Sequence, residues 1–102
     1  MYAVIFRATA KQLDEEYNQT AARMRELAKR KYGCVEFVSV QEGDQEIAIS
    51  YWRSEQDIQA WKNDPEHLRA QALGKSHWYQ SYRVEVVQIL RHYHSKLKQP
   101  GS

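Results

Sequence analysis

Residues 51–82 read YWRSEQDIQAWKNDPEHLRAQALGKSHWYQSY and contain all three tryptophans of the chain, three of its seven tyrosines and two of its four histidines. Such a concentration of aromatic rings is typical of a core or of a ligand site. Within it, Ser54 to Asp57 predicts a helix start, because a Ser hydroxyl can accept from a free backbone N–H and acids favour the positive helix end. This helix directs Ile58 and Trp61 inward.

Asp64-Pro65 predicts a second helix start immediately after the first helix. Asp caps helices well, and proline suits the first helical position because its N–H is not needed there. Leu68 and Gln71 continue one helical face until Gly74, which we expect to end the helix. Residues 51–82 therefore form a strand end, a bent pair of helices and, from Trp78 onward, the entry to a last strand.

The segments outside residues 51–82 supply a second helix and more strands. Residues 2–7, 34–41, 45–52 and 79–90 are short runs rich in β-branched and aromatic side chains, and Glu42-Gly43-Asp44 between the middle two predicts a hairpin. Apolar residues recur every three or four positions from Leu13 to Tyr32, which predicts an amphipathic helix, with a capping box at Thr9 and Gln12 and an end at Gly33.

The order strand, helix, strand, strand, helix, strand is that of the ferredoxin-like split βαβ fold, an α+β class with an antiparallel sheet and helices on one face. We expect one domain over residues 1–91 and a polar C-terminal tail over residues 92–102. Alternate residues of a strand point to opposite faces of the sheet, and here both sets are apolar. In residues 45–52 one set is Ile47, Ile49 and Tyr51 and the other includes Ala48 and Trp52. Helices can cover one face, so a second copy of the chain would have to cover the other, and we predict a homodimer.

Composition limits the classes of partner. The chain has 15 basic and 13 acidic residues and a formal net charge of +2, with no stripe of one sign. Neither nucleic acid nor a membrane is therefore an expected partner. The single Cys34 cannot form an internal disulfide, and the N-terminus shows no basic leader or long apolar run, so we expect a cytoplasmic protein.

The aromatic pattern resembles a known family. A tryptophan at a strand end (Trp52), a second in a capped helix (Trp61), the turn Asp64-Pro65-Glu66-His67 and the entry Trp78-Tyr79 are similar to the antibiotic biosynthesis monooxygenase (ABM) domain. The resemblance covers nearly the whole chain. It implies that two copies pair their sheets into a dimeric α+β barrel, in whose interior we place Val86.

Three residues are candidates for catalysis. Trp61 can offer an indole N–H from an apolar wall, His67 lies in a first helical turn where the dipole favours a neutral imidazole, and Arg7 is a possible donor. Trp61 is equally well explained as a core residue and His67 as a surface residue. Candidate ligand-binding residues are Tyr51, Gln71, Trp78 and Tyr82. We expect the cavity between the helical pair and the sheet, where Asp64-Pro65 interrupts helix packing.

The resemblance implies a cofactor-independent oxygenation, in which an electron-rich planar aromatic or polyketide-like substrate is deprotonated and reacts with dioxygen. The alternative is a non-enzymatic homodimeric module that binds a small hydrophobic ligand. Haem-degrading members of the superfamily have an iron-ligating histidine where this chain has Gln71, which argues against haem degradation. His77, His92 and His94 lack the spacing of a metal site, so we predict no metal and no cofactor.

Overall fold

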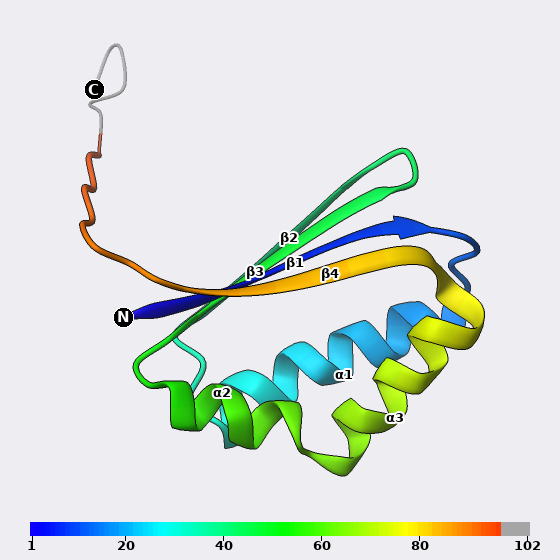
Figure 1. The fold of residues 1–102 in the computed structure, drawn as a ribbon, viewed down its shortest axis with the longest axis horizontal. Helices are drawn as coiled ribbons and strands as arrows, with labels where there is room; N and C mark the ends of the chain where they lie inside the picture. The colour runs from blue at the N-terminus through cyan, green and yellow to red at the C-terminus, as the bar shows by residue number, and fades with distance from the viewer. Residues whose placement is uncertain (97–102) are drawn as a thin grey trace.

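The computed structural model describes residues 1–96 and has an α+β architecture of one sheet and one helical layer (Figure 1). The four strands lie in the order β2-β3-β1-β4, and each neighbouring pair is antiparallel. This confirms the ferredoxin-like split βαβ prediction. The elements are β1 (Tyr2–Ala10), α1 (Glu15–Lys31), β2 (Glu36–Glu42), β3 (Gln45–Trp52), α2 (Glu55–Lys62), α3 (Pro65–Leu73), a π-helical turn (Gly74–Trp78) and β4 (Tyr79–Gln88).

The helices all lie on one side of the sheet (Figure 1). Because side chains alternate along a strand, the strand register assigns each residue to one of two faces. The covered face meets the helices and comprises Val4, Phe6 and Ala8 on β1, Phe37 and Ser39 on β2, Glu46, Ala48 and Ser50 on β3, and Tyr82, Val84 and Val86 on β4. The bare face comprises Ala3, Ile5 and Arg7, Val38 and Val40, Ile47, Ile49 and Tyr51, and Arg83, Glu85 and Val87.

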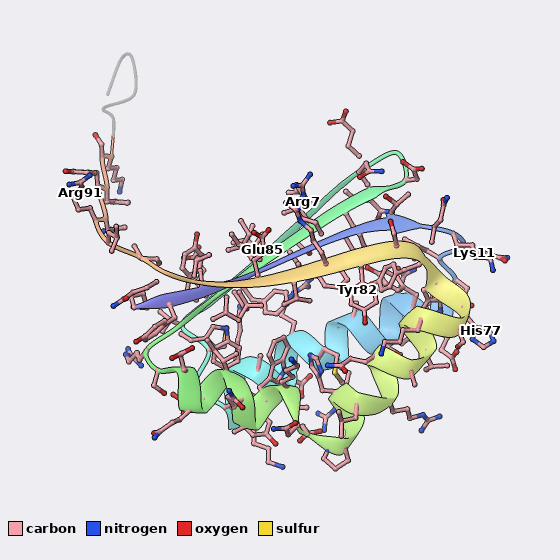
Figure 2. The ribbon with its side chains drawn as sticks, viewed as in Figure 1. Arg7, Lys11, His77, Tyr82, Glu85 and Arg91 are labelled. Atoms are coloured by element: carbon pink, nitrogen blue, oxygen red, sulfur yellow. The ribbon has the colours of Figure 1, made fainter. Side chains whose placement is uncertain are left out.

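Two side chains of β4 and one of β1 illustrate the division. Figure 2 shows Arg7 and Glu85 pointing away from the helices and Tyr82 pointing toward them. Val86 shares the parity of Tyr82 and pairs with Val4, so it belongs to the covered face. Our placement of Val86 inside a sheet-to-sheet barrel was therefore wrong, because sequence alternation alone does not say which parity meets the helices.

Helix α1 begins later than expected. Thr9 lies within β1, which runs to Ala10, so the predicted cap at Thr9 is wrong. Asp14 is the N-cap instead, and its carboxylate accepts from the backbone N–H of Tyr17 at 2.8 Å. At the other end Gly33 has a φ of +78°, the left-handed conformation that closes a helix most readily at glycine.

The bend between α2 and α3 is built as the sequence predicted. The Ser54 hydroxyl accepts from the N–H of Asp57 at 3.2 Å, and the Asp64 carboxylate accepts from the N–H of Glu66 at 2.8 Å. Asp64 is 5% exposed and also accepts from the Tyr32 hydroxyl at 2.5 Å, with Lys31 Nζ at 3.7 Å. One carboxylate thus begins α3 and joins it to the end of α1.

Helix α3 ends at Leu73 with Gly74 as its C-cap, as we predicted, but the chain does not enter β4 directly. Gly74 has right-handed helical dihedrals and opens the π-helical turn that continues to Trp78. The Ser76 hydroxyl donates to the backbone oxygen of Ala72 at 3.0 Å within this wider turn. The extra residue of the turn places Trp78 inward, at 3% exposure, immediately before β4.

The core lies under the first residues of β1 and the last residues of β3. Trp52 is fully buried and its indole N–H donates to the Ser50 hydroxyl at 2.8 Å. The other members of this cluster are Val4, Ala28, Cys34, Ile58 and Trp61. Burial raises the pKa of the Cys34 thiol, which makes it a small apolar core group.

Beyond β4 the described chain has no helix or strand up to residue 96 and extends away from the domain (Figure 1). Leu90 and Tyr93 are both 86% exposed there. The predicted tail also includes residues 97–102, which lie outside the described part of the chain. Within residues 1–96, none of the helices combines the length and the apolar composition that crossing a bilayer requires.

Candidate functional site

A cavity of about 980 Å³ separates the helices from the covered face of the sheet. It is lined by Trp61 on α2, His67 and Gln71 on α3, and by residues of β1 and β3 such as Phe6 and Glu46. It lies between the helical pair and the sheet, where we expected a cavity, and it also extends along α1. A volume of this size can enclose a drug-sized ligand.

Trp61 stands at the border between the core and this cavity. Its ring lies 5.1 Å from that of Trp52 and 4.3 Å from that of His67, measured between centroids. The side chain is 8% exposed, and its indole nitrogen is buried without a hydrogen-bond partner in residues 1–96. Trp61 therefore belongs to the core cluster and to the cavity wall at once, and both sequence interpretations describe part of its environment.

His67 is held in the cavity wall by Trp61 on one side and by Gln71 on the other. The Gln71 amide nitrogen lies 3.0 Å from Nδ1 of His67, one helical turn away on α3. Burial lowers the pKa of His67 to about 4, so the imidazole is neutral at pH 7. Because the Gln71 amide nitrogen is a donor, Nδ1 of His67 acts as the acceptor of this hydrogen bond. Gln71 itself has no imidazole with which to bind a haem iron.

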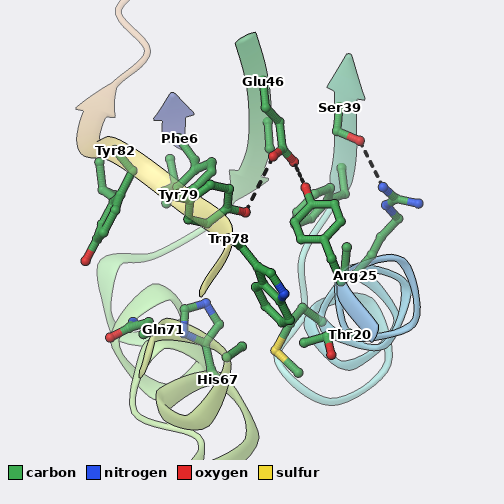
Figure 3. Close-up of a pocket in the computed structure, with 18 of the residues that line it drawn as sticks. Phe6, Thr20, Arg25, Ser39, Glu46, His67, Gln71, Trp78, Tyr79 and Tyr82 are labelled. Carbon is green, nitrogen blue, oxygen red and sulfur yellow. Dashed lines mark hydrogen bonds between the residues drawn. The ribbon is translucent and has the colours of Figure 1, made fainter. Parts of the chain in front are cut away.

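A second polar group in the cavity was missed by sequence reasoning. Glu46, on β3, accepts hydrogen bonds from the hydroxyls of Tyr17 on α1 and Tyr79 at the start of β4 (Figure 3). Burial and the contact with Glu46 raise the pKa of Tyr17, and burial raises the pKa of Tyr79, so both remain protonated donors. The available signal was a charged residue at an inward position of a strand, but the inward parity was unknown.

Arg25 forms the cavity wall where α1 crosses β2. Its guanidinium carbon lies 5.4 Å from the centre of the Phe37 ring, and Nη2 donates to the Ser39 hydroxyl at 2.9 Å. Nε is buried without a hydrogen-bond partner among the described residues. A cation over an aromatic face beside the cavity gives this wall a positive edge.

The other sequence candidates divide between the two faces. Trp78 and Tyr82 line the cavity with Trp61, His67 and Gln71. Arg7 and Tyr51 do not join them, because both lie on the bare face. Arg7 pairs across the strands with Arg83, and the two line a shallow hollow with Thr9, Gln45 and Ser81.

The carboxylates, thiol and imidazoles of residues 1–96 form no group of three or more close enough to hold a metal ion. The chemistry available in the cavity is that of an aromatic wall, a neutral imidazole, a carboxylate and buried N–H donors that no group of residues 1–96 accepts from. These groups can bind a planar ring, accept a proton and donate to an oxygen atom.

One protein of known sequence and two proteins of known structure resemble this chain over most of its length. The uncharacterized protein YqjZ of Bacillus subtilis is 41% identical over 91 residues, which are 88% of this chain and 80% of that protein. The structure of Rv0793 from Mycobacterium tuberculosis superposes with a TM-score of 0.78 at 17% identity, covering 91% of this chain and 98% of that one. A variant of SnoaB, a cofactor-independent oxygenase from Streptomyces nogalater, has a TM-score of 0.75 at 15% identity, covering 89% and 94%.

At these low identities the two solved structures show a shared fold. The sequence itself carries the family assignment, since residues 1–73 match the profile described as antibiotic biosynthesis monooxygenase. That match spans β1 to the end of α3 and so includes Trp61, His67 and Gln71 in the cavity wall. The chain belongs to the antibiotic biosynthesis monooxygenase family.

Proposed function

We propose that the protein is a cofactor-independent monooxygenase that acts on a small planar aromatic or polyketide-like substrate. The observation that carries the proposal is the cavity beside Trp61, which has aromatic walls, a neutral imidazole and an indole N–H without a partner in residues 1–96. SnoaB, which has a similar fold, is itself described as a cofactor-independent oxygenase. The substrate would lie between α3 and the covered face.

In this reaction an acidic C–H or O–H of the substrate loses its proton to a base of the cavity, and the electron pair stays on the ring. The anion then reacts with dioxygen. One oxygen atom remains in the product as a carbonyl, and the other leaves as water with the two hydrogens that the substrate has lost. His67 is the proposed base, and Trp61 donates to the developing oxyanion from the cavity wall.

A second function fits one observation better. Because the pKa of His67 is about 4, its imidazole is a weak base and matches proton abstraction at neutral pH poorly. A non-enzymatic module that holds a small hydrophobic ligand needs the same cavity but no base. Gln71, Trp78 and Tyr82 would contact the ligand in either case.

Oxygen uptake separates these two functions. Wild-type protein is mixed with a hydroxylated anthracene, and dissolved oxygen and tryptophan fluorescence are followed together. A monooxygenase quenches and consumes one dioxygen per substrate, whereas a binding module quenches without uptake. Absence of both signals would contradict the proposal and its alternative.

Trp61→Phe and Trp52→Phe form a matched pair for the cavity. Trp61→Phe keeps an aromatic ring and removes the N–H, so we expect a weaker ligand response at near-normal stability. Trp52 is fully buried in the core and its N–H is paired with Ser50, so Trp52→Phe should lower Tm and leave ligand binding unchanged. Lost stability with unchanged binding in Trp61→Phe would show that Trp61 is a core residue only.

The functional unit is proposed to be a homodimer that joins two bare faces. Val38, Val40 and Ile47 are 44%, 62% and 38% exposed there, and they lie beside Ile5 and Ile49 in one apolar surface. Soluble monomers rarely leave such a continuous surface in water. A second copy would cover it and leave each cavity within its own chain. The cytoplasmic location stays a prediction.

A further inference from the structure

Glu46 is a carboxylate in the wall of the cavity. It projects from β3 toward the helices, since it pairs with Ala8 on one side and Gln41 on the other and shares their covered-face parity. In Figure 3 it reaches down from the sheet, while His67 and Gln71 lie across the cavity on α3. No ion pair involving Glu46 occurs among the residues that the structure describes. Its only polar contacts there are the two tyrosine hydroxyls.

The two carboxylate oxygens are unequally satisfied. Oε1 accepts a short hydrogen bond from the Tyr17 hydroxyl. Oε2 has only the Tyr79 hydroxyl at 3.4 Å, a distance at which an O–H···O bond is weak. Each carboxylate oxygen can accept two hydrogen bonds, so Oε2 has capacity for a further donor.

The tyrosine whose hydroxyl approaches Oε2 belongs to an aromatic cluster in the cavity wall. Phe6, Tyr79 and Tyr82 form a cluster whose ring centroids are 5.4 to 6.1 Å apart. All three line the same cavity as Glu46, with Trp78 beside them. A planar ligand that packs on these rings can therefore bring a hydroxyl donor to Oε2.

We propose that Oε2 of Glu46 accepts a hydrogen bond from a ring hydroxyl of the ligand and thereby selects hydroxylated fused rings over their O-methylated counterparts. This inference rests on the proposed function, which places a planar ring in the cavity. The ring lies against the Phe6, Tyr79 and Tyr82 cluster, and its hydroxyl points to the sheet. Its opposite edge meets His67 and Gln71. A methyl ether fills a similar space but offers Oε2 no hydrogen, so it should bind more weakly.

Calorimetric titration with 1-naphthol and 1-methoxynaphthalene tests the selection. Wild-type protein should bind 1-naphthol about tenfold more tightly, the effect of one hydrogen bond to a charged acceptor. Glu46→Gln keeps the shape and a neutral acceptor, so the preference should fall to a few-fold. Glu46→Leu removes the acceptor and should abolish the preference. Tyr17→Phe is the matched control, because it removes a neighbour of Oε1 and should keep the preference.

The results of these titrations distinguish a failure of the role proposed for Glu46 from a failure of the proposed function. Two results would overturn the role of Glu46 and leave the cavity proposal standing. One is equal binding of the two ligands by wild-type protein. The other is a preference that survives in Glu46→Leu or, if that variant does not fold, a preference that is undiminished in Glu46→Gln. If neither ligand binds wild-type protein, the proposed function fails and this inference fails with it. A preference that declines in the order wild type, Glu46→Gln, Glu46→Leu supports it.

Discussion

The covered face of the sheet encloses a cavity with polar groups at its walls, whereas the bare face presents apolar side chains that nothing in residues 1–96 covers. Val84 and Val38 represent the two faces and have similar exposures, 49% and 44%. Val84 is exposed because β4 lies at the edge of the sheet and opens into the cavity. Val38 is exposed because no helix or strand of residues 1–96 packs on its face. Similar exposure therefore has two origins, and the two faces should respond differently to the same substitution.

The largest expected effect is that of Val38→Asp. In the proposed dimer this carboxylate would be buried without a partner, at a cost of several kcal/mol, so the assembly should dissociate. The mass by light scattering should fall from twice the chain mass of 12.1 kDa to one chain. Val84→Asp, on the covered face, should keep the dimer mass. A monomeric wild-type protein, or equal effects of the two substitutions, would remove the distinction between the faces.

The helical layer that defines the covered face depends on Asp64. Asp64→Asn weakens the cap of α3 and the bond from Tyr32, and we expect Tm to fall by roughly 5–10 °C at pH 7. The Tyr32 hydroxyl holds the pKa of Asp64 below its usual value of 3.8. The stabilisation is therefore complete above that usual value and is lost as pH falls through the lower native pKa. Thermal melts of the two proteins should converge at low pH, and a gap independent of pH would contradict this.

A smaller effect is expected from the titration of His67 in the cavity. Burial lowers its pKa from 6.5 to about 4, so between these values the unfolded chain binds a proton that the native state does not. The free energy of unfolding should then fall as pH drops from 6.5 toward 4. Its slope against pH corresponds to the uptake of at most one proton on unfolding. His67→Asn keeps a polar neighbour for Gln71 and should flatten this part of the profile. Urea unfolding at several pH values measures it, and an unchanged slope would mean that His67 is not desolvated.

The smallest effect should come from the outer surface of the helices. Arg23 contacts Glu66 across α1 and α3 at 2.8 Å, but both side chains are 49% exposed. Solvent and salt weaken such pairs. Arg23→Gln should leave Tm unchanged within the error of a melting experiment. A loss comparable to that of Asp64→Asn would show that exposed contacts, and not the buried Asp64, hold the covering layer.

The sequence predicted most of the fold because local signals and tertiary packing agree. Ser54, Asp64 and Gly33 have the chemistry that helix boundaries require, and the structure uses Ser54 and Asp64 as N-caps and Gly33 in a left-handed conformation after α1. The order of elements followed from these boundaries. Thr9 failed as a cap because β1 continues through it, and pairing with a neighbouring strand outweighed a local capping signal.

The site was predicted less completely because its composition depends on which strand parity meets the helices. Trp61 was found from its inward position on the capped helix α2, and His67 and Gln71 from their places on the helix that begins after Asp64-Pro65. Arg7 was assigned to the site and Glu46 was overlooked for the same reason: each is a charged residue on a strand, and alternation does not reveal which face the helices cover. Knowledge of one contact between a helix and the sheet, such as that of Tyr17 with Glu46, would have shown which face of the sheet the helices cover.

Gly74 shows how this site constrains attempts to make the protein more heat-resistant. Design by helix propensity would replace a glycine with right-handed dihedrals by alanine and expect a gain on the order of 1 kcal/mol. A methyl group there would lie 3.0 Å from two ring carbons of Tyr79. The ring would have to shift, and its hydroxyl would move relative to Glu46. A more thermostable variant should therefore keep Gly74 and carry helix-favouring substitutions at other positions.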